Sequence, residues 1–146
     1  MIDIENLVFD TLYNGLIALH PNANITSGYD EQNAKPLTVV ARQTNSQPYR
    51  ASATDDCSEN HTRVTFEIEV FSTKESTGRS ECKTVLADAD TIMQGMKFRR
   101  VHLNRPINVD RTRWRQYARY EVIVGKPVTY DKGTANERTV FQMYRR

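Results

Sequence analysis

The chain has 146 residues, of which 38% are hydrophobic and 26% are charged, and its net charge is +2. This length suits one domain with one core, and the composition excludes a disordered chain. No apolar run approaches the about 20 residues that span a bilayer. The first ten residues, MIDIENLVFD, lack the basic-then-apolar pattern of a signal peptide, so we expect synthesis in a cytoplasm.

The first predicted element is a helix over residues 4–19. Apolar residues recur there at helical spacing, Asp3 stands where it can cap the first turn, and Pro21 ends the helix. Two short extended segments follow, at 25–29 and 37–42. Residues 43–61 are polar and show no periodicity, which predicts a long loop.

The clearest predicted strand covers residues 62–71, where apolar and polar side chains alternate. Its apolar face is formed by Val64, Phe66, Ile68 and Val70. Glu67 and Glu69 fall on the opposite face. A second amphipathic helix is predicted over residues 79–96, with Cys82 and the methionines on its apolar stripe.

The last third of the chain predicts more strands. One covers residues 98–103 and a long one covers 112–124, where Trp114 and Tyr120 share the core-facing side. Residues 126–146 predict a hairpin around Asp131-Lys132-Gly133 or a flexible C-terminal extension. The whole pattern predicts a single α+β domain over residues 1–146, with a central antiparallel sheet and two helices packed on it.

Reactive side chains do not gather at the spacing that catalysis or metal binding requires. None of the three histidines, His20, His61 and His102, has a second histidine or a cysteine at metal-ligand spacing. Cys57 follows two aspartates, whose charge raises the pKa of a thiol and weakens it as a nucleophile. We therefore predict a protein that is not an enzyme and that has no cofactor, catalytic residue or metal site. A small enzyme using Cys57 and His61 is a minor alternative.

Charge is divided unevenly along the chain. Residues 1–96 hold 7 Lys and Arg against 14 Asp and Glu, whereas residues 97–146 hold 13 against 4. Such asymmetry indicates a charged partner. The partner is either a nucleic acid or another copy of the chain, whose acidic surface meets a basic one head to tail.

Arginines recur on one face of the predicted strand at 112–124 and just before it. The set is Arg111, Arg113, Arg115 and Arg119, with Tyr117 among them. Three interpretations stay open. The arginines pair with Glu67 and Glu69 of a neighbouring strand, they contact another subunit or line a lumen, or they bind nucleic acid through phosphates and base stacking.

The order of the segments resembles the tail terminator, or tail-completion, family of siphophages and related prophages. The matching segments are ENLVFDTL, ITSGYDEQNAKPLTVV, the Asn45 to Arg50 stretch, ENHTRVTFEIEVFST, GRSECKTVLADADTIM, MKFRRVHLNRPIN and RTRWRQYARYEVIV. They cover about residues 5–124. The most distinctive are Glu59-Asn60 before the strand, Ser80-Glu81-Cys82-Lys83 at the helix start, and Arg119-Tyr120. Leu37 departs from the family, which often has an aromatic residue there.

The resemblance implies a structural virion protein without catalytic activity. It implies a ring, typically a hexamer, at the head-proximal end of the tail tube. There the ring stops tube polymerisation and joins the tail to the head connector, with DNA passing through the lumen without specific binding. The implied partners are copies of the chain, the tail tube protein and head–tail connector proteins, with no membrane.

The candidate subunit-interface or lumen residues are Arg111, Arg113, Arg115, Arg119, Glu67 and Glu69. The alternative function is that of a nucleic-acid-binding accessory protein, which uses the Arg-rich strand at 111–119.

Overall fold

The computed structural model describes residues 2–28, 36–49, 61–74, 76–110, 113–125, 128–130, 138–140 and 143–144. Within these residues the helices are α1 (Glu5–Leu19) and α2 (Gly78–Gly95). The strands are β1 (Asn24–Thr26), β2 (Leu37–Pro48), β3 (His61–Ser72), β4 (Arg99–Leu103), β5 (Ile107–Asp110), β6 (Arg113–Gly125), β7 (Val128–Tyr130), β8 (Arg138–Val140) and β9 (Met143–Tyr144). The predicted single-domain α+β class is confirmed.

In the described part of the chain, seven strands form one sheet in the order β1-β2-β3-β6-β4, with β5 and β9 also on β6. The long strands β2, β3 and β6 pair antiparallel, as predicted. The pair of β1 and β2 differs, because these strands run parallel in the register Asn24↔Thr38. The sheet is therefore mixed at one edge. The prediction missed this because the apolar pattern that indicates a strand carries no information about the direction of that strand.

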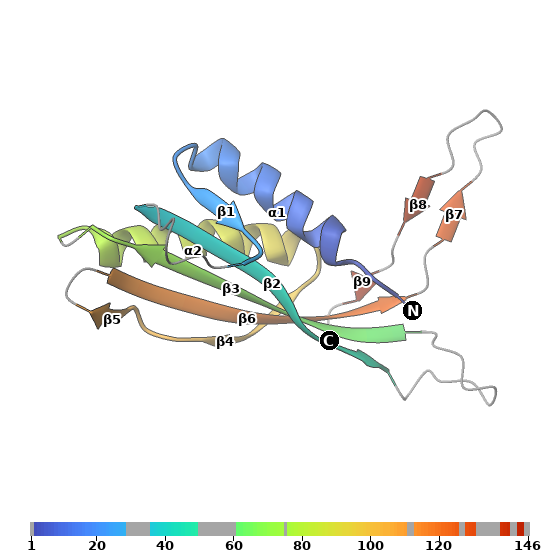
Figure 1. Cartoon of the computed structure of the whole chain (residues 1–146). Helices are drawn as coiled ribbons and strands as arrows, with labels where there is room; N and C mark the ends of the chain where they lie inside the picture. The colour runs from blue at the N-terminus through green and yellow to red at the C-terminus, as the bar shows by residue number, and fades with distance from the viewer. Residues whose placement is uncertain are drawn as a thin grey trace.

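Three short strands share the outer edge of β6. β9 pairs with Ile123 and Val124, β4 with residues 118–121, and β5 with residues 113–115. β7 and β8 form a separate antiparallel pair, which agrees with the predicted hairpin, although the predicted turn at 131–133 lies outside the described residues. Figure 1 shows this pair standing away from the sheet.

Both helices lie on the same face of the sheet (Figure 1). α1 packs against α2 and β2, whereas α2 packs against β3, β6 and β4. A Cβ atom on Gly15 would lie 2.6 Å from Ile92 Cδ1, so glycine allows the two helices to approach closely. The largest fully buried side chains between the layers are Tyr120, Phe66, Phe98, Ile4, Leu12, Leu16, Ile68 and Met93.

The predicted loop at 43–61 is wrong at its start. Residues 43–48 continue β2 and pair with residues 62–66 of β3. The prediction failed because most of these side chains are exposed, so the segment keeps strand pairing through its backbone while losing apolar alternation. Residues 50–60 lie outside the described chain. The gap between the predicted strands at 98–103 and 112–124 is also shorter than expected, because β5 begins at Ile107.

Neither of the described helices is long and apolar enough to cross a membrane.

Candidate functional site

A charged cluster lies on the face of the sheet that points away from the helices. Alternation along β3 buries Phe66 and Ile68 in the core and turns Glu67 and Glu69 to the other face. Across the sheet, Glu67 stands opposite Arg42 of β2 on one side and opposite Arg119 of β6 on the other. The register of the three long strands therefore brings distant charges together.

Four close contacts connect these side chains. Arg119 Nη2 lies 3.2 Å from Glu67 Oε2, and Arg115 Nη2 lies 3.1 Å from Glu69 Oε1. Arg42 bridges the two carboxylates, because its Nη2 lies 3.4 Å from Glu67 Oε1 and 3.2 Å from Glu69 Oε1. We call these five residues the arginine–glutamate cluster. It holds three positive and two negative side chains.

The two glutamates are almost covered although neither described helix lies over them. Glu67 is 8% exposed and Glu69 is 7% exposed, whereas the side chains of Arg42 and Arg119 remain about half exposed, at 48% and 47%. The long arginine side chains extend over the carboxylates and leave their own outer parts in water. The cluster is therefore shielded at the level of the glutamates and open at the level of the guanidinium groups.

The pKa values of the two glutamates move in opposite directions. Burial raises the pKa of Glu67, but hydrogen bonds from Glu69, Arg119 and Arg42 outweigh it and hold that pKa below its ordinary value. The pKa of Glu69 is raised, first by burial and then by its hydrogen bond with Glu67, despite the opposing effect of Arg115. The pair thus takes up its first proton at Glu69.

Aromatic rings surround Arg115. Its guanidinium carbon lies 5.0 Å from the centre of the Tyr117 ring and 6.0 Å from that of Phe71, distances at which cation–π attraction operates. The Tyr117 ring in turn lies 5.4 Å from His102. The Nε–H of Arg115 is buried and donates to no acceptor among the described residues. Arg115 is therefore the most enclosed arginine of the cluster.

The structure brings together four of the six predicted site residues, namely Glu67, Glu69, Arg115 and Arg119. Arg113 stands apart at the start of β6, where its Cα partner is Asp110 of β5. Arg111 lies outside the described residues. The sequence prediction missed Arg42, because nothing in LTVVAR marks it. Only the β2–β3 register, in which Arg42 faces Glu67, identifies it.

The arrangement suits mechanical and recognition roles. Ion pairs across three strands fix their register, and the exposed guanidinium groups can donate to an anionic group of a partner. Among the described residues, no group of three His, Cys, Asp or Glu side chains is placed to hold a metal ion.

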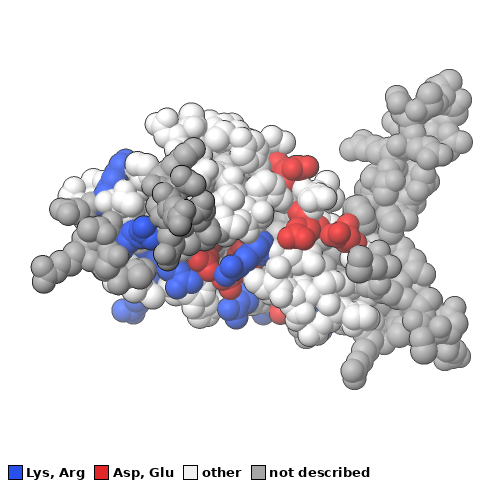
Figure 2. Space-filling view, in the orientation of Figure 1, with Lys and Arg blue, Asp and Glu red and all other residues white. Residues whose placement is uncertain are grey.

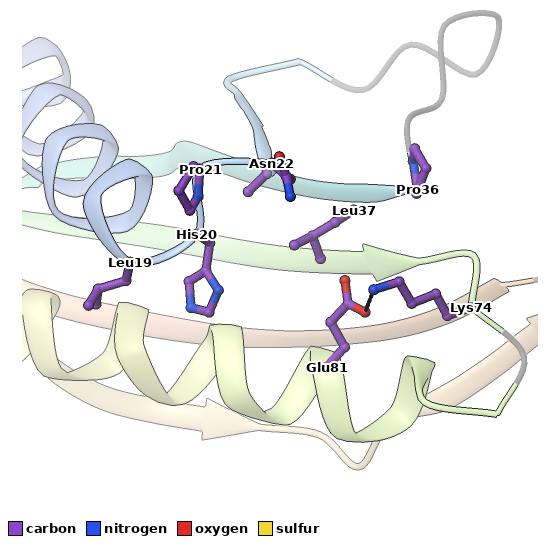
Figure 3. Close-up of a pocket in the computed structure, with 9 residues that line it drawn as sticks. Leu19, His20, Pro21, Asn22, Pro36, Leu37, Lys74 and Glu81 are labelled. Atoms are coloured by element: carbon purple, nitrogen blue, oxygen red, sulfur yellow. Dashed lines mark ion pairs between the residues drawn. The ribbon is translucent and has the colours of Figure 1, made fainter.

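A hollow of about 710 Å³ lies at the other side of the molecule, where α1 ends (Figure 3). Its lining is Leu19, His20, Pro21, Asn22, Ala23, Pro36, Leu37, Lys74 and Glu81. The polar and charged side chains of Lys74, Glu81 and His20 there have partners within the chain. Lys74 Nζ lies 2.9 Å from Glu81 Oε2, and His20 Nε2 lies 2.6 Å from Asp88 Oδ2. These contacts join the end of α1 and the end of β3 to α2.

The remaining reactive side chains lie in structural surroundings. Cys82 is buried in the core as predicted, with its Sγ 3.7 Å from the carbonyl oxygen atoms of Val70 and Trp114. Burial, and then the charge of Glu81, raises the pKa of this thiol to about 11. His61 begins β3 and packs edge-on against Tyr144. Cys57, the other half of the predicted minor alternative, lies outside the described residues.

Tyr120 and Arg100 share Asp90. The Tyr120 hydroxyl donates to Asp90 Oδ1 over 2.9 Å, and Arg100 Nη1 lies 3.3 Å from the same oxygen. Burial, followed by the charge of Asp90, strongly raises the pKa of Tyr120. This contact ties α2 to the sheet. Asp90 and Asp88 therefore serve separate partners within the chain.

No protein-family model and no curated protein sequence matches the chain.

Proposed function

We propose that this chain is a structural protein of a long-tailed bacteriophage. In this proposal, copies form a ring at the head-proximal end of the tail tube. The ring terminates tube polymerisation and joins the tail to the head connector. The protein acts by assembly and catalyses no reaction.

The observation that carries the proposal is the internal pairing of the arginine–glutamate cluster. Its three arginines contact Glu67 and Glu69 at 3.1–3.4 Å. The most conspicuous charged group of the chain is thus nearly neutral and holds three strands in register. Such a face suits a rigid building block better than a site that captures a highly charged ligand. The resemblance of the segment order to tail terminator proteins adds the place of assembly.

The competing function, nucleic-acid binding by residues 111–119, has one observation in its favour. Arg42 and Arg119 keep about half of their side-chain surface exposed, and Tyr117 lies beside Arg115. Binding to phosphates depends strongly on the net positive charge of the surface. Glu67 and Glu69 cancel most of that charge, so we favour assembly.

Two experiments test the assembly function. Light scattering of the purified protein over a range of concentrations, with and without purified tail tubes, should show a discrete oligomer or binding to tube ends. Electron micrographs of particles made without the protein should show overlong tails for a terminator, or normal tails separated from heads for a joining protein. A chain that stays monomeric and ignores tubes contradicts the proposal.

The nucleic-acid alternative has its own test. Electrophoretic mobility of DNA and RNA at low salt should be unchanged by the protein under the assembly proposal. Salt-sensitive binding that is lost when Arg113, Arg115 and Arg119 are replaced by alanine would instead support the alternative.

A further inference from the structure

An acidic and partly apolar surface lies at the start of α1. Leu7 and Asp10 lie on the face of α1 opposite the buried Val8 and Leu12, and Asp3 stands just before the helix, where its Oδ1 accepts from the Glu5 backbone N–H. All three side chains are exposed, and Leu7 exposes 45% of its surface. We call these three residues the acidic helix face. No Lys or Arg occurs in residues 1–34, so nothing in that part of the sequence offsets its charge.

A basic and partly apolar surface lies at the far edge of the sheet. It comprises β4 and the turn into β5, with the exposed residues Arg99, Val101, Leu103, Arg105 and Ile107. We call these five residues the basic edge. Val101, Leu103 and Ile107 are between 43% and 47% exposed. No Asp or Glu occurs in residues 97–109. Arg99 stands opposite Glu121 of β6, so Arg105 is the arginine of this surface that offers its charge to a partner. Large exposed side chains of this kind are concentrated at interaction surfaces.

The two surfaces lie on opposite sides of the molecule. Figure 1 shows α1 at the top of the view and β4 and β5 along the bottom. The sheet order explains this separation, because α1 packs over β2 whereas β4 lies beyond β3 and β6. Figure 2 shows acidic side chains over the start of α1, and mainly basic side chains, with some acidic ones among them, over the strands. The two surfaces of one copy are therefore too far apart to pair with each other.

The two surfaces are complementary in charge and in apolar composition. The acidic helix face needs a partner with basic side chains around an apolar centre, and the basic edge has that composition. The reverse also holds. Phosphate groups of a nucleic acid would pair with Arg105 but would leave Val101, Leu103 and Ile107 without apolar contacts. A second copy of the chain supplies both charge and apolar surface.

The backbone of the basic edge is also open. In the described residues β4 pairs with β6 and with no strand on its other side. Its ladder shifts register between Arg100 and His102, and such bulges and edge charges discourage pairing with an arbitrary strand. The acidic helix face does not add a strand to this edge, so it meets the exposed side chains of β4 and of the turn into β5.

We propose that the acidic helix face of one copy docks on the basic edge of the next. This inference rests on the proposed ring-forming function and names its subunit contact. The contact joins two different surfaces on opposite sides of the subunit, so it is heterologous, and a chain of copies has a free acidic helix face at one end and a free basic edge at the other. A ring forms when the rotation between copies closes.

Charge reversal provides a test with a built-in rescue. Asp10→Arg changes only the acidic helix face, and Arg105→Glu changes only the basic edge. Each variant alone faces like charge at every contact, so its self-association should weaken at least about tenfold. In an equimolar mixture every contact between unlike variants is again complementary. The mixture should assemble to within about threefold of the wild type, with the two variants alternating.

Matched controls separate this contact from general effects of charge and fold. Arg79→Glu makes the same charge change as Arg105→Glu on the exposed first turn of α2, and it should leave assembly unchanged. Leu7→Ser should weaken assembly about threefold to tenfold, whereas Leu19→Ser, on the same helix but at its other end, should not. Circular dichroism melting curves show whether each variant is folded.

The outcomes distinguish the inference from the proposed function. Assembly is measured by analytical ultracentrifugation, with tail tubes added where the protein alone stays dispersed. Loss of assembly in both single variants and recovery in the mixture support the contact. If the wild type assembles and Asp10→Arg assembles equally well, the contact is wrong while the ring-forming function stands. If the wild type stays monomeric with tubes present, both are wrong.

Discussion

The arginine–glutamate cluster and the two oppositely charged surfaces use the same residue types in opposite ways. In the cluster, strand register places every carboxylate within 3.4 Å of an arginine of the same chain. The acidic helix face and the basic edge lie on opposite sides of the molecule. Net charge alone therefore does not identify a binding surface. What matters is whether the fold has already brought the opposite charge beside it.

The largest expected effect comes from removing a carboxylate of the cluster. Glu67→Ala leaves Arg119 without the carboxylate it contacts and Arg42 with one fewer, and we expect it to lower the free energy of unfolding by about 2–3 kcal/mol. Urea denaturation measures the change. Asp10→Ala is the matched control on the acidic helix face and should change stability by less than about 0.5 kcal/mol. Equal effects of the two substitutions would contradict the comparison.

The arginines of the cluster should differ from one another. Arg115 is the most enclosed and contacts Glu69, Tyr117 and Phe71, so Arg115→Ala should cost about 1–2 kcal/mol of unfolding free energy. Arg119 is about half exposed, so Arg119→Ala should cost less than about 1 kcal/mol. The same denaturation measurement applies to both. An equal or reversed order would show that burial does not rank these pairs.

Salt should weaken the contact between the exposed surfaces much more than it weakens the arginine–glutamate cluster. Raising the salt concentration to 1 M shortens the Debye length to about 3 Å, so it should weaken self-association through the exposed surfaces by about tenfold. Unfolding free energy should change far less, because Glu67 and Glu69 are buried. Sedimentation and thermal unfolding at matched salt concentrations measure the two effects. Assembly that is indifferent to salt would argue for an apolar contact.

The smallest effect concerns pH. The lowered pKa of Glu67 gives stability that is present above the unfolded value of 4.5 and is lost as the pH falls through the folded value. The raised pKa of Glu69 acts in the opposite sense, because its contribution is greatest at low pH and is lost as the pH rises through the folded value. Between neutral pH and pH 4.5 the protonation of Glu69 should therefore favour the folded state.

Glu69→Gln isolates this contribution. The variant should lose the stabilisation that develops on acidification towards pH 4.5, while keeping the loss at lower pH that comes from Glu67. Melting temperatures measured from pH 3 to pH 8 test the difference. If the curves for the wild type and Glu69→Gln run parallel, the raised pKa of Glu69 has no measurable effect on stability.

The sequence predicted the elements whose two faces meet different surroundings. Val64, Phe66, Ile68 and Val70 are fully buried as predicted, because the helices cover only one face of β3 and alternation records that difference. Both helices were also predicted to within about one residue of their observed bounds. Amphipathic patterns are strong wherever burial is one-sided.

Features that depend on pairing between distant segments were not predictable in this way. Residues 43–48 of β2 show no alternation of apolar and polar side chains, because most of these side chains are exposed. The parallel direction of β1 and the position of Arg42 opposite Glu67 follow from register, which one segment alone does not contain. For the candidate site, pairing of the arginines with Glu67 and Glu69 was one of three open interpretations, and the strand order selected the members of the cluster.

The division of the outer edge of β6 among three short strands has a consequence for local stability. β9, β4 and β5 each pair with only a few residues of β6. Each of them can therefore detach while the β2–β3 and β3–β6 pairs stay intact. Amide hydrogens of β4 should therefore exchange with solvent through small openings, and those at the centre of β3 only through global unfolding. The edge can readjust to a neighbour while the rest of the molecule stays folded.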